Sequence, residues 1–222
     1  MEKTTYVYDD NGNVKKISTE GNAIMEYTYN KANLPEKLVS RKSASAVLTT
    51  YNIGYCYDGN KASIEETGNP TINYTYDGIG RLKTETSAGT YQNTYTYDSR
   101  QNRSTKVYTD FISNTTTETE YIYNLNNQLL KESQKTAGIT NITNYYYDAN
   151  GNQIRKLYSK LEPKVKGEAE ALGLDTASDL LEQYCYDVWN RLTGVVINGM
   201  SATYTYDGNG LRQSKTVNGV TT

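Results

Sequence analysis

The sequence predicts an all-β protein, in which tandem antiparallel β-hairpins form a curved or spiralling sheet. The first observation is a repeat, Tyr-x-Tyr-Asp/Asn, which occurs nine times in 222 residues and contains 18 of the 23 tyrosines. Regular repetition of one short unit is typical of a stacked array. The second observation is composition. Hydrophobic residues are only 36% of the chain, but aromatics at 11% and a net charge of −2 do not fit a disordered chain.

Each repeat is predicted to form one hairpin. In the copy that begins at Tyr74, strand alternation places Tyr74 and Tyr76 on one face of the sheet. Asp77 and Gly80 then occupy the first and fourth positions of a type I turn, where Asp accepts a local hydrogen bond and Gly tolerates positive φ. This three-residue hairpin contains a bulge, so Tyr76 is expected opposite Leu82.

The other copies follow the same rule, with Asp or Asn first in the turn and Gly or Asn fourth in seven of nine copies. Lys61 and Gln101 take the fourth position in the third and fifth turns, which are therefore expected to be strained or longer. The predicted structural motif comprises Tyr6, Tyr8, Asp9, Gly12, Tyr27, Tyr29, Asn30, Tyr55, Tyr57, Asp58, Tyr74, Tyr76, Asp77, Gly80, Tyr95, Tyr97, Asp98, Tyr121, Tyr123, Asn124, Tyr145, Tyr147, Asp148, Gly151, Tyr184, Tyr186, Asp187, Tyr204, Tyr206, Asp207 and Gly210.

Three segments are predicted along the chain. Residues 1–158 form the main hairpin array, residues 159–183 form an insertion, and residues 184–222 continue the repeats and stop within one. The insertion loses strand alternation, and Glu168 to Leu172 has a helical composition. Thr176 or Ser178 could cap a second short helix that runs through Leu180 to Glu182. The insertion is interpreted as a surface loop, because loops tolerate added residues.

The tyrosines have two possible uses. Two on one face of every hairpin can form a continuous cross-strand ladder, which holds neighbouring strands together. Alternatively, their rings can stack on sugars. The ladder is favoured, because the sheet has few other large side chains to bury. The better candidates for exposed contacts are the tyrosines outside the motif, namely Tyr51, Tyr91, Tyr108, Tyr146 and Tyr158.

No catalytic, cofactor-binding or metal-binding residue is expected. The chain has no histidine, which excludes His-dependent triads and His-bearing zinc sites. Turn loops such as Asp9 to Asn13 offer oxygen ligands but lack the spacing of a calcium loop, and turn chemistry explains them. Cys56 and Cys185 lie between motif tyrosines, and five hairpins separate them, so they are expected to be unpaired packing residues.

Charge and hydropathy limit the partners. The balance of 23 basic and 25 acidic residues argues against nucleic acid or an anionic membrane surface. No apolar run approaches the ~18 residues of a membrane span. The N-terminal residues lack the apolar region of a signal peptide. Both ends look like cuts in a longer array, so exposed edge strands that could drive self-association are expected.

Residues 74–82 (Tyr-Thr-Tyr-Asp-Gly-Ile-Gly-Arg-Leu) and 204–212 (Tyr-Thr-Tyr-Asp-Gly-Asn-Gly-Leu-Arg) resemble the YD repeats of the Rhs family. That family includes bacterial Rhs proteins, wall-associated YD-repeat proteins, toxin-complex components and teneurins. The resemblance implies a β-ribbon that spirals into a hollow shell, which in many bacterial members encloses a C-terminal toxin. Such members also carry a self-cleaving segment near Asp-Pro-x-Gly-Leu. This chain contains no Asp-Pro, so no catalytic residue is carried over.

The resemblance therefore implies a non-enzymatic segment of a shell, secreted or at the bacterial cell surface. Its partners would be the remaining YD repeats of the same polypeptide and an enclosed toxin or effector. The alternative is a cell-surface module, like an adhesin, that binds carbohydrate or protein on its exposed sheet face. Glycans are partners under that alternative only.

Overall fold

A computed structural model describes residues 3–20, 23–161, 180–197 and 199–222. These residues form antiparallel β-strands and no helix, so the predicted all-β fold is confirmed. The 19 strands are β1 (Thr4–Tyr8), β2 (Val14–Thr19), β3 (Ile24–Tyr29), β4 (Pro35–Arg41), β5 (Val47–Tyr55), β6 (Lys61–Glu66), β7 (Ile72–Tyr76), β8 (Leu82–Ser87), β9 (Tyr91–Tyr97), β10 (Arg103–Asp110), β11 (Thr115–Tyr123), β12 (Leu129–Thr136), β13 (Ile139–Tyr147), β14 (Gln153–Leu161), β15 (Leu180–Tyr186), β16 (Leu192–Ile197), β17 (Met200–Tyr206), β18 (Arg212–Val217) and β19 (Val220–Thr221).

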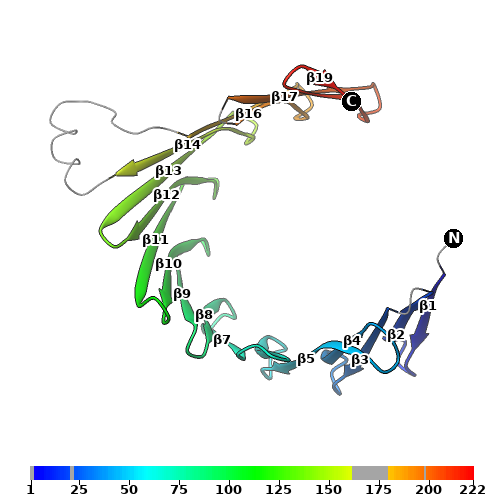
Figure 1. Cartoon of the computed structure of the whole chain (residues 1–222). Coiled ribbons are helices and arrows are strands. Elements are labelled where there is room, and N and C mark those ends of the chain that lie inside the picture. Colours follow the sequence, from blue (N-terminus) through cyan, green and yellow to red (C-terminus); the bar gives the residue numbers. More distant parts are fainter. Residues whose placement is uncertain (1–2, 21–22, 162–179, 198) are drawn as a thin grey trace. The chain divides into compact units, whose positions relative to one another are not determined.

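The chain divides into two compact units. The first comprises Met1–Tyr95 with Tyr108–Asn114, and the second comprises Thr96–Val107 with Thr115–Thr222. In the first unit each strand from β1 to β9 pairs with the next strand in the chain. In the second unit β11 to β19 do the same (Figure 1). Each unit is therefore a run of hairpins in chain order.

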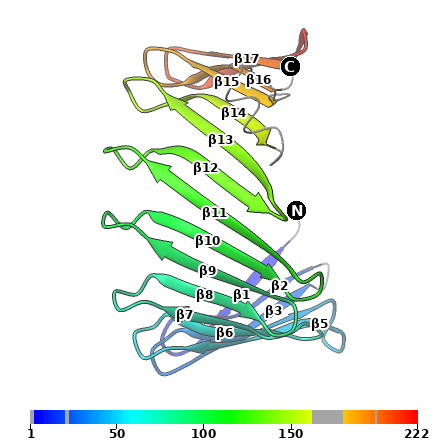
Figure 2. The same cartoon turned by 90° about the vertical axis from the view of Figure 1, so that its left-hand side faces the viewer.

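Nine turns of one type connect the two strands of each hairpin. In every one the fourth residue donates its N–H to the carbonyl of the first, at 3.0–3.1 Å. The first residue donates its own N–H to the carbonyl of the fifth, at 2.8–3.0 Å. The fourth residue always has positive φ, and it is Gly, Asn or Gln. Within each unit, antiparallel alternation places these turns at one edge of the strands, as Figure 2 shows for β11 to β14.

A β-bulge follows the turn in the eight hairpins whose register is described, as predicted. Tyr76 pairs with Leu82 and Thr75 with Thr84, so Lys83 is the extra residue of the bulged strand. The same shift in register falls immediately before Tyr8, Tyr29, Tyr123, Tyr147, Tyr186 and Tyr206. Bulges raise the local twist of a hairpin and leave ladder groups without a strand partner. Those groups need another hydrogen-bond donor or acceptor.

Burial is shallow in both units. Among the described residues only Tyr95, at 9% exposed, is a buried hydrophobic side chain. Most other motif tyrosines are half-buried, whereas Tyr6 and Tyr8 on β1 are exposed. The strands thus form a single layer in which one face is covered mainly by its own tyrosines. Stability must come from the ladder and from contacts between successive hairpins.

The predicted alignment of the third repeat is wrong by two residues. Its turn begins at Cys56 and takes positive φ at Gly59, so Lys61 is not the fourth residue. Tyr55 therefore occupies the second-tyrosine position and Ile53 the first, and Tyr55 pairs with Lys61. Tyr57 and Asp58 lie in the turn itself, where Tyr57 is fully exposed. This alignment gives 21 residues from Ile53 to Tyr74, equal to the next interval.

The fifth turn fulfils one of its two expected outcomes, since it is strained and not longer. It has the same length and hydrogen bonds as the others, so it is not longer. Gln101 simply takes the left-handed conformation at φ 71, which costs a non-glycine residue energy.

The predicted helix through Leu180 to Glu182 is wrong, because these residues belong to β15. They pair with Lys156 to Tyr158 of β14, and ladder pairing overrides their helical composition. The predicted helix at 168–172 and the caps at Thr176 and Ser178 lie outside the described residues. Strands β14 and β15 extend into the predicted insertion from both sides.

Candidate functional site

The candidate site is the repeated contact between successive hairpins. In five hairpins the hydroxyl of the second tyrosine donates a hydrogen bond to a carbonyl of the preceding hairpin, at 2.8–3.0 Å. The pairs are Tyr29 with Val14, Tyr55 with Pro35, Tyr76 with Lys61, Tyr147 with Leu129, and Tyr206 with Leu192. Every acceptor is the first residue after the preceding turn. We call this contact the tyrosine lock.

The bulge explains why the lock falls at that residue. The strands of neighbouring hairpins pair only beyond this point; β2 and β3, for instance, pair from Lys16 onward. The carbonyl of Val14 would otherwise face no strand partner, and an unpaired backbone carbonyl is costly when it is shielded from water. The phenol of Tyr29 supplies the missing donor. The motif tyrosines were predicted to hold neighbouring strands together, and the second tyrosine of the repeat does so through this hydrogen bond.

The side-chain carboxylate or amide of the first turn residue binds the backbone of later residues in the same turn. In eight turns its Oδ1 accepts N–H bonds from the third and fifth residues, at 2.8–3.1 Å. These bonds lower the pKa of Asp77, with the Arg81 backbone as the largest cause, and of Asp9, with the Asn13 side chain as the largest. Cys56 cannot accept such bonds, and Asp58 Oδ1 accepts from Asn60 N at 3.0 Å instead.

A second contact joins successive turns, from the fifth residue of one to the fourth residue of the next. Asn13 Nδ2 donates to Asn33 Oδ1 at 3.1 Å, Asn102 Nδ2 to Asn127 Oδ1 at 2.9 Å, and Asn152 Nδ2 to Asn190 Oδ1 at 2.8 Å. Where the fourth residue is glycine, a longer side chain reaches backbone instead, as Gln128 Nε2 reaches the carbonyl of Gly151 at 3.4 Å. We call these contacts the turn ladder.

The turn ladder explains why asparagine replaces glycine at the left-handed position. Asn33, Asn127 and Asn190 each face an asparagine at the fifth position of the previous turn. Glycine would adopt the conformation more readily but has no side-chain acceptor. The sequence shows both asparagines, but only the spatial order of the turns reveals that they pair.

The tyrosines outside the motif are not brought together into one site. In the first unit, Tyr51 donates to Glu66 at 2.7 Å, and Tyr91 donates to Glu85 at 2.8 Å and packs 6.0 Å from Tyr108. In the second unit, Tyr146 is 38% exposed, and the guanidinium carbon of Arg155 lies 4.1 Å from the centre of its ring. Tyr158 lies on β14. Their use as exposed binding contacts remains a prediction.

Both cysteines are free, with Cys185 exposed and Cys56 half-buried. Cys185 lies between two motif tyrosines as predicted and pairs with Gly194, whereas Cys56 begins a turn. Within the described ranges, no group of three or more Asp, Glu, Cys or His side chains is placed to hold a metal. The described part of the chain also contains no helix with the length and hydropathy of a membrane span.

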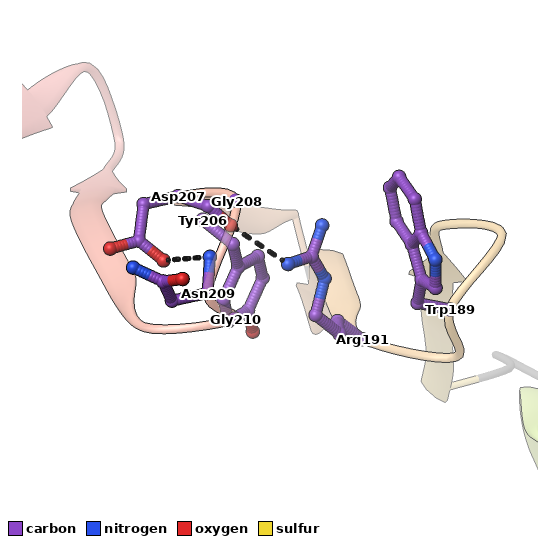
Figure 3. A pocket seen from close by; sticks show the side chains of 7 residues that line it. All are labelled: Trp189, Arg191, Tyr206, Asp207, Gly208, Asn209 and Gly210. Atoms are coloured by element: carbon purple, nitrogen blue, oxygen red, sulfur yellow. Dashed lines mark hydrogen bonds between the residues drawn. The ribbon is translucent and has the colours of Figure 1, made fainter.

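The turn edge of the second unit carries a pocket of about 430 Å³. It is lined by Trp189, Arg191, Tyr206 and the turn residues Asp207 to Gly210 (Figure 3). Arg191 donates through Nε to Asp187 at 2.6 Å and through Nη1 to the carbonyl of Asp207 at 3.1 Å. Sequence reasoning missed this pocket, although the chain's single Trp at a turn position was a signal.

Comparisons with known proteins agree with this architecture. No family model matches the chain. Over 219 residues it is 29% identical to the tRNA3(Ser)-specific nuclease WapA of Bacillus spizizenii, a match that covers 97% of this chain and 8% of that protein. Its fold is similar to that in the crystal structure of TcdB2-TccC3-Cdc42, with a TM-score of 0.60 and 15% identity. That likeness covers 96% of this chain and 13% of the other.

Fold and site together define a tandem β-hairpin repeat protein, in which tyrosine and turn contacts join the hairpins. The predicted resemblance to the Rhs/YD-repeat family is confirmed.

Proposed function

We propose that this chain is a non-enzymatic wall segment of a YD-repeat shell that encloses a C-terminal toxin or effector domain, secreted or at the bacterial cell surface. The observation that carries the proposal is the tyrosine lock. In five hairpins it joins the hairpin to the one before it through a backbone carbonyl, whatever the side chain at that position. A contact that ignores side-chain identity suits a wall that extends by repetition.

The use of the polar groups supports a structural role. The turn carboxylates accept two backbone bonds each, and several also accept a side-chain donor, as Asp148 Oδ2 does from Asn152 at 3.0 Å. The side-chain hydrogen bond from Asn152 is the main cause that lowers the pKa of Asp148, so this carboxylate is a poor general acid or base at neutral pH. This stretch matches only 8% of the nuclease relative, so the nuclease activity of that protein does not bear on this chain.

The test is protection of a C-terminal domain in the native polypeptide that carries this chain. We expect a protease to cleave that domain slowly when the hairpin array is intact and rapidly when the locks are removed by Tyr147→Phe with Tyr206→Phe. The matched control is Tyr57→Phe, because Tyr57 is exposed in a turn and joins no hairpins. Cleavage as fast in the intact protein as in the domain alone would overturn enclosure.

A further inference from the structure

The chain contains five Asn-Gly dipeptides, and the structure describes both residues of four: Asn11-Gly12, Asn150-Gly151, Asn209-Gly210 and Asn218-Gly219. Asparagine is chemically labile in this dipeptide, because glycine has no side chain to shield the backbone nitrogen that follows the asparagine. That nitrogen can attack the side-chain carbonyl carbon of the asparagine and displace its amide group. The four dipeptides differ in the two groups that this reaction uses.

The first difference concerns the glycine nitrogen. Gly12, Gly151 and Gly210 are each the fourth residue of a hairpin turn, and their N–H groups donate to the carbonyl of the first residue at 3.0–3.1 Å. Attack by such a nitrogen first requires the turn to open, so the turn protects the asparagine before it. Gly219 instead lies in the two-residue connection between β18 and β19. Among the hydrogen bonds of the described residues, its N–H has no acceptor.

The second difference concerns the side-chain carbonyl. Asn218 Oδ1 accepts a hydrogen bond from the backbone N–H of Ser201 at 3.0 Å. A backbone donor at this distance stabilises the negative charge that develops on the oxygen when a nucleophile adds to the carbonyl carbon. In the described part of the chain, the side-chain oxygens of Asn11, Asn150 and Asn209 accept no hydrogen bond. Both differences therefore single out the same dipeptide.

The reaction also needs water and hydroxide at the site. Asn218 and Gly219 are both exposed, with φ values of 47 and 86, as in the turn of a two-residue hairpin. The N–H of Asn218 donates to the carbonyl of Ser201 at 3.0 Å, so the backbone and the side chain of Asn218 are both bonded to one residue of β17. The electrophilic carbonyl is thus held in place beside its stabilising donor.

We propose that Asn218 is a site of spontaneous deamidation, with the Gly219 nitrogen as nucleophile and the Ser201 N–H as the donor that stabilises the oxyanion. Hydroxide removes the proton from the Gly219 nitrogen, which forms a bond to Cγ of Asn218. The Cγ–Nδ2 bond then breaks, and Nδ2 leaves as ammonia with a proton from water. The five-membered succinimide that remains is opened by water at either carbonyl, which gives aspartate or isoaspartate at position 218.

The modification changes a contact between two hairpins. Isoaspartate brings Cβ into the main chain, so the backbone lengthens and the two hydrogen bonds between Asn218 and Ser201 lose their geometry. Aspartate keeps the side-chain acceptor and adds one negative charge. The change is irreversible, since the ammonia is lost. The site is independent of the proposed enclosure, because the chemistry needs only Asn218, Gly219 and Ser201.

Peptide mapping of the 222-residue chain, incubated at mildly alkaline pH, tests the proposal. Trypsin places Asn218 in a peptide of its own, residues 216–222, and mass spectrometry detects the exchange of an amide for a carboxylate. We expect deamidation at Asn218 to be about tenfold or more faster than at Asn11, Asn150 or Asn209. A rate at Asn218 no faster than at any of these three would overturn the proposal.

The same incubation in urea separates structure from local sequence. The four rates should converge, because unfolding removes both the turn bonds and the Ser201 donor. A preference for Asn218 that persists unchanged in urea would assign it to the neighbouring residues and would overturn the structural explanation. This comparison needs no variant, so it holds whether or not a substitution at Ser201 permits folding.

Ser201→Pro tests the oxyanion donor, because proline has no backbone N–H. We expect the rate at Asn218 to fall by about tenfold or more, as for the loss of one such donor. The matched control is Ser201→Ala, which keeps the N–H and should leave the rate unchanged. Circular dichroism and the rate at Asn209 report whether the β17–β18 hairpin remains folded in both variants. An unchanged rate at Asn218 in a folded Ser201→Pro chain would overturn the role of the donor.

Discussion

The hydroxyl of Tyr76 donates a 2.8 Å hydrogen bond to the carbonyl oxygen of Lys61, across the boundary between two successive hairpins. Tyr76 is the second tyrosine of its repeat, and Lys61 is the first residue after the preceding turn. The same relationship recurs in both units of the chain. One residue of the repeat thus serves two hairpins, since its ring covers its own hairpin and its hydroxyl binds the one before.

This relationship predicts different costs for two substitutions at Tyr76. Tyr76→Phe keeps the ring and loses the hydrogen bond, and we expect a loss of about 0.5–1 kcal/mol, because the site is partly open to water. Tyr76→Ala also removes the ring, and we expect about 2–3 kcal/mol, below the ~3–5 for a fully buried aromatic, since Tyr76 is half-buried. Urea unfolding followed by circular dichroism measures both. Tyr57→Phe is the control, at under about 0.5 kcal/mol. Equal losses for Phe and Ala would contradict the role of the ring.

The turn ladder predicts opposite signs for two glycine substitutions. Asn190 at φ 61 accepts hydrogen bonds from the side chains of Asn152 and Asn150. Asn190→Gly relieves the backbone but removes both bonds, and we expect a net loss of about 0.5–1 kcal/mol. Ala137 at φ 49 has no side-chain hydrogen bond to lose, and Ala137→Gly should stabilise by about 0.5–1 kcal/mol. Thermal unfolding of the two variants beside the parent measures these signs. A stabilising Asn190→Gly would show that the two bonds contribute less than the left-handed backbone costs, which would contradict this prediction.

Burial and hydrogen bonding to carboxylates predict a loss of stability at high pH. Burial is the main cause that raises the pKa of Tyr91 and of Tyr145 to about 12, and for Tyr184 it is the hydrogen bond with Glu182. In the unfolded chain these phenols titrate near 10.0. Between these values the unfolded state releases its protons first, so stability falls as pH rises. The contribution is fully present below pH 10 and is lost on approach to about pH 12.

The measurement is the urea midpoint at pH 9, 10 and 11, which lie just below and within the range set by the raised tyrosine pKa values. We expect the midpoint to decline as the absorbance of tyrosinate appears. Glu132→Gln removes the carboxylate that accepts from Tyr145 at 3.3 Å, so its decline should be shallower. The control is Glu36→Gln, on β4 in the other unit. Identical pH profiles for Glu132→Gln and the parent would show that this carboxylate does not set the dependence.

Local chemistry made the hairpins predictable, because Asp first and Gly or Asn fourth specify the turn, and alternation specifies the tyrosine face. The pairing of Tyr76 with Leu82 followed from the turn alone. The alignment of the third repeat was predicted wrongly because Tyr55 to Asp58 matches the motif literally. Gly59 is the fourth residue of the true turn, which begins at Cys56 and not at Asp58. Contacts between hairpins, such as Asn152 with Asn190, depend on which turns become neighbours, and no local rule supplies that.

The alignment of the third repeat gives the last prediction. Cys56 is the first residue of its turn, the place of Asp or Asn in the other eight, and it cannot accept the N–H bonds of the third and fifth residues. Cys56→Asp should supply an acceptor for the N–H of Asp58, while the N–H of Asn60 is already accepted by Asp58 Oδ1 at 3.0 Å. With one bond gained, we expect the chain to be stabilised by about 0.5–1 kcal/mol, as measured by urea unfolding. The carboxylate needs no new space, since the backbone bonds of this turn match those of the others.

Cys56→Ala is the matched control, because it removes the thiol without adding an acceptor, and it should not stabilise. The gain from Cys56→Asp should also disappear below the ordinary Asp pKa, near pH 3.8, because its folded pKa would be lowered by the same bonds that lower that of Asp9. Stability from a lowered pKa is present above that value and is lost as pH falls. A destabilising Cys56→Asp at neutral pH would instead support a turn that begins at Asp58.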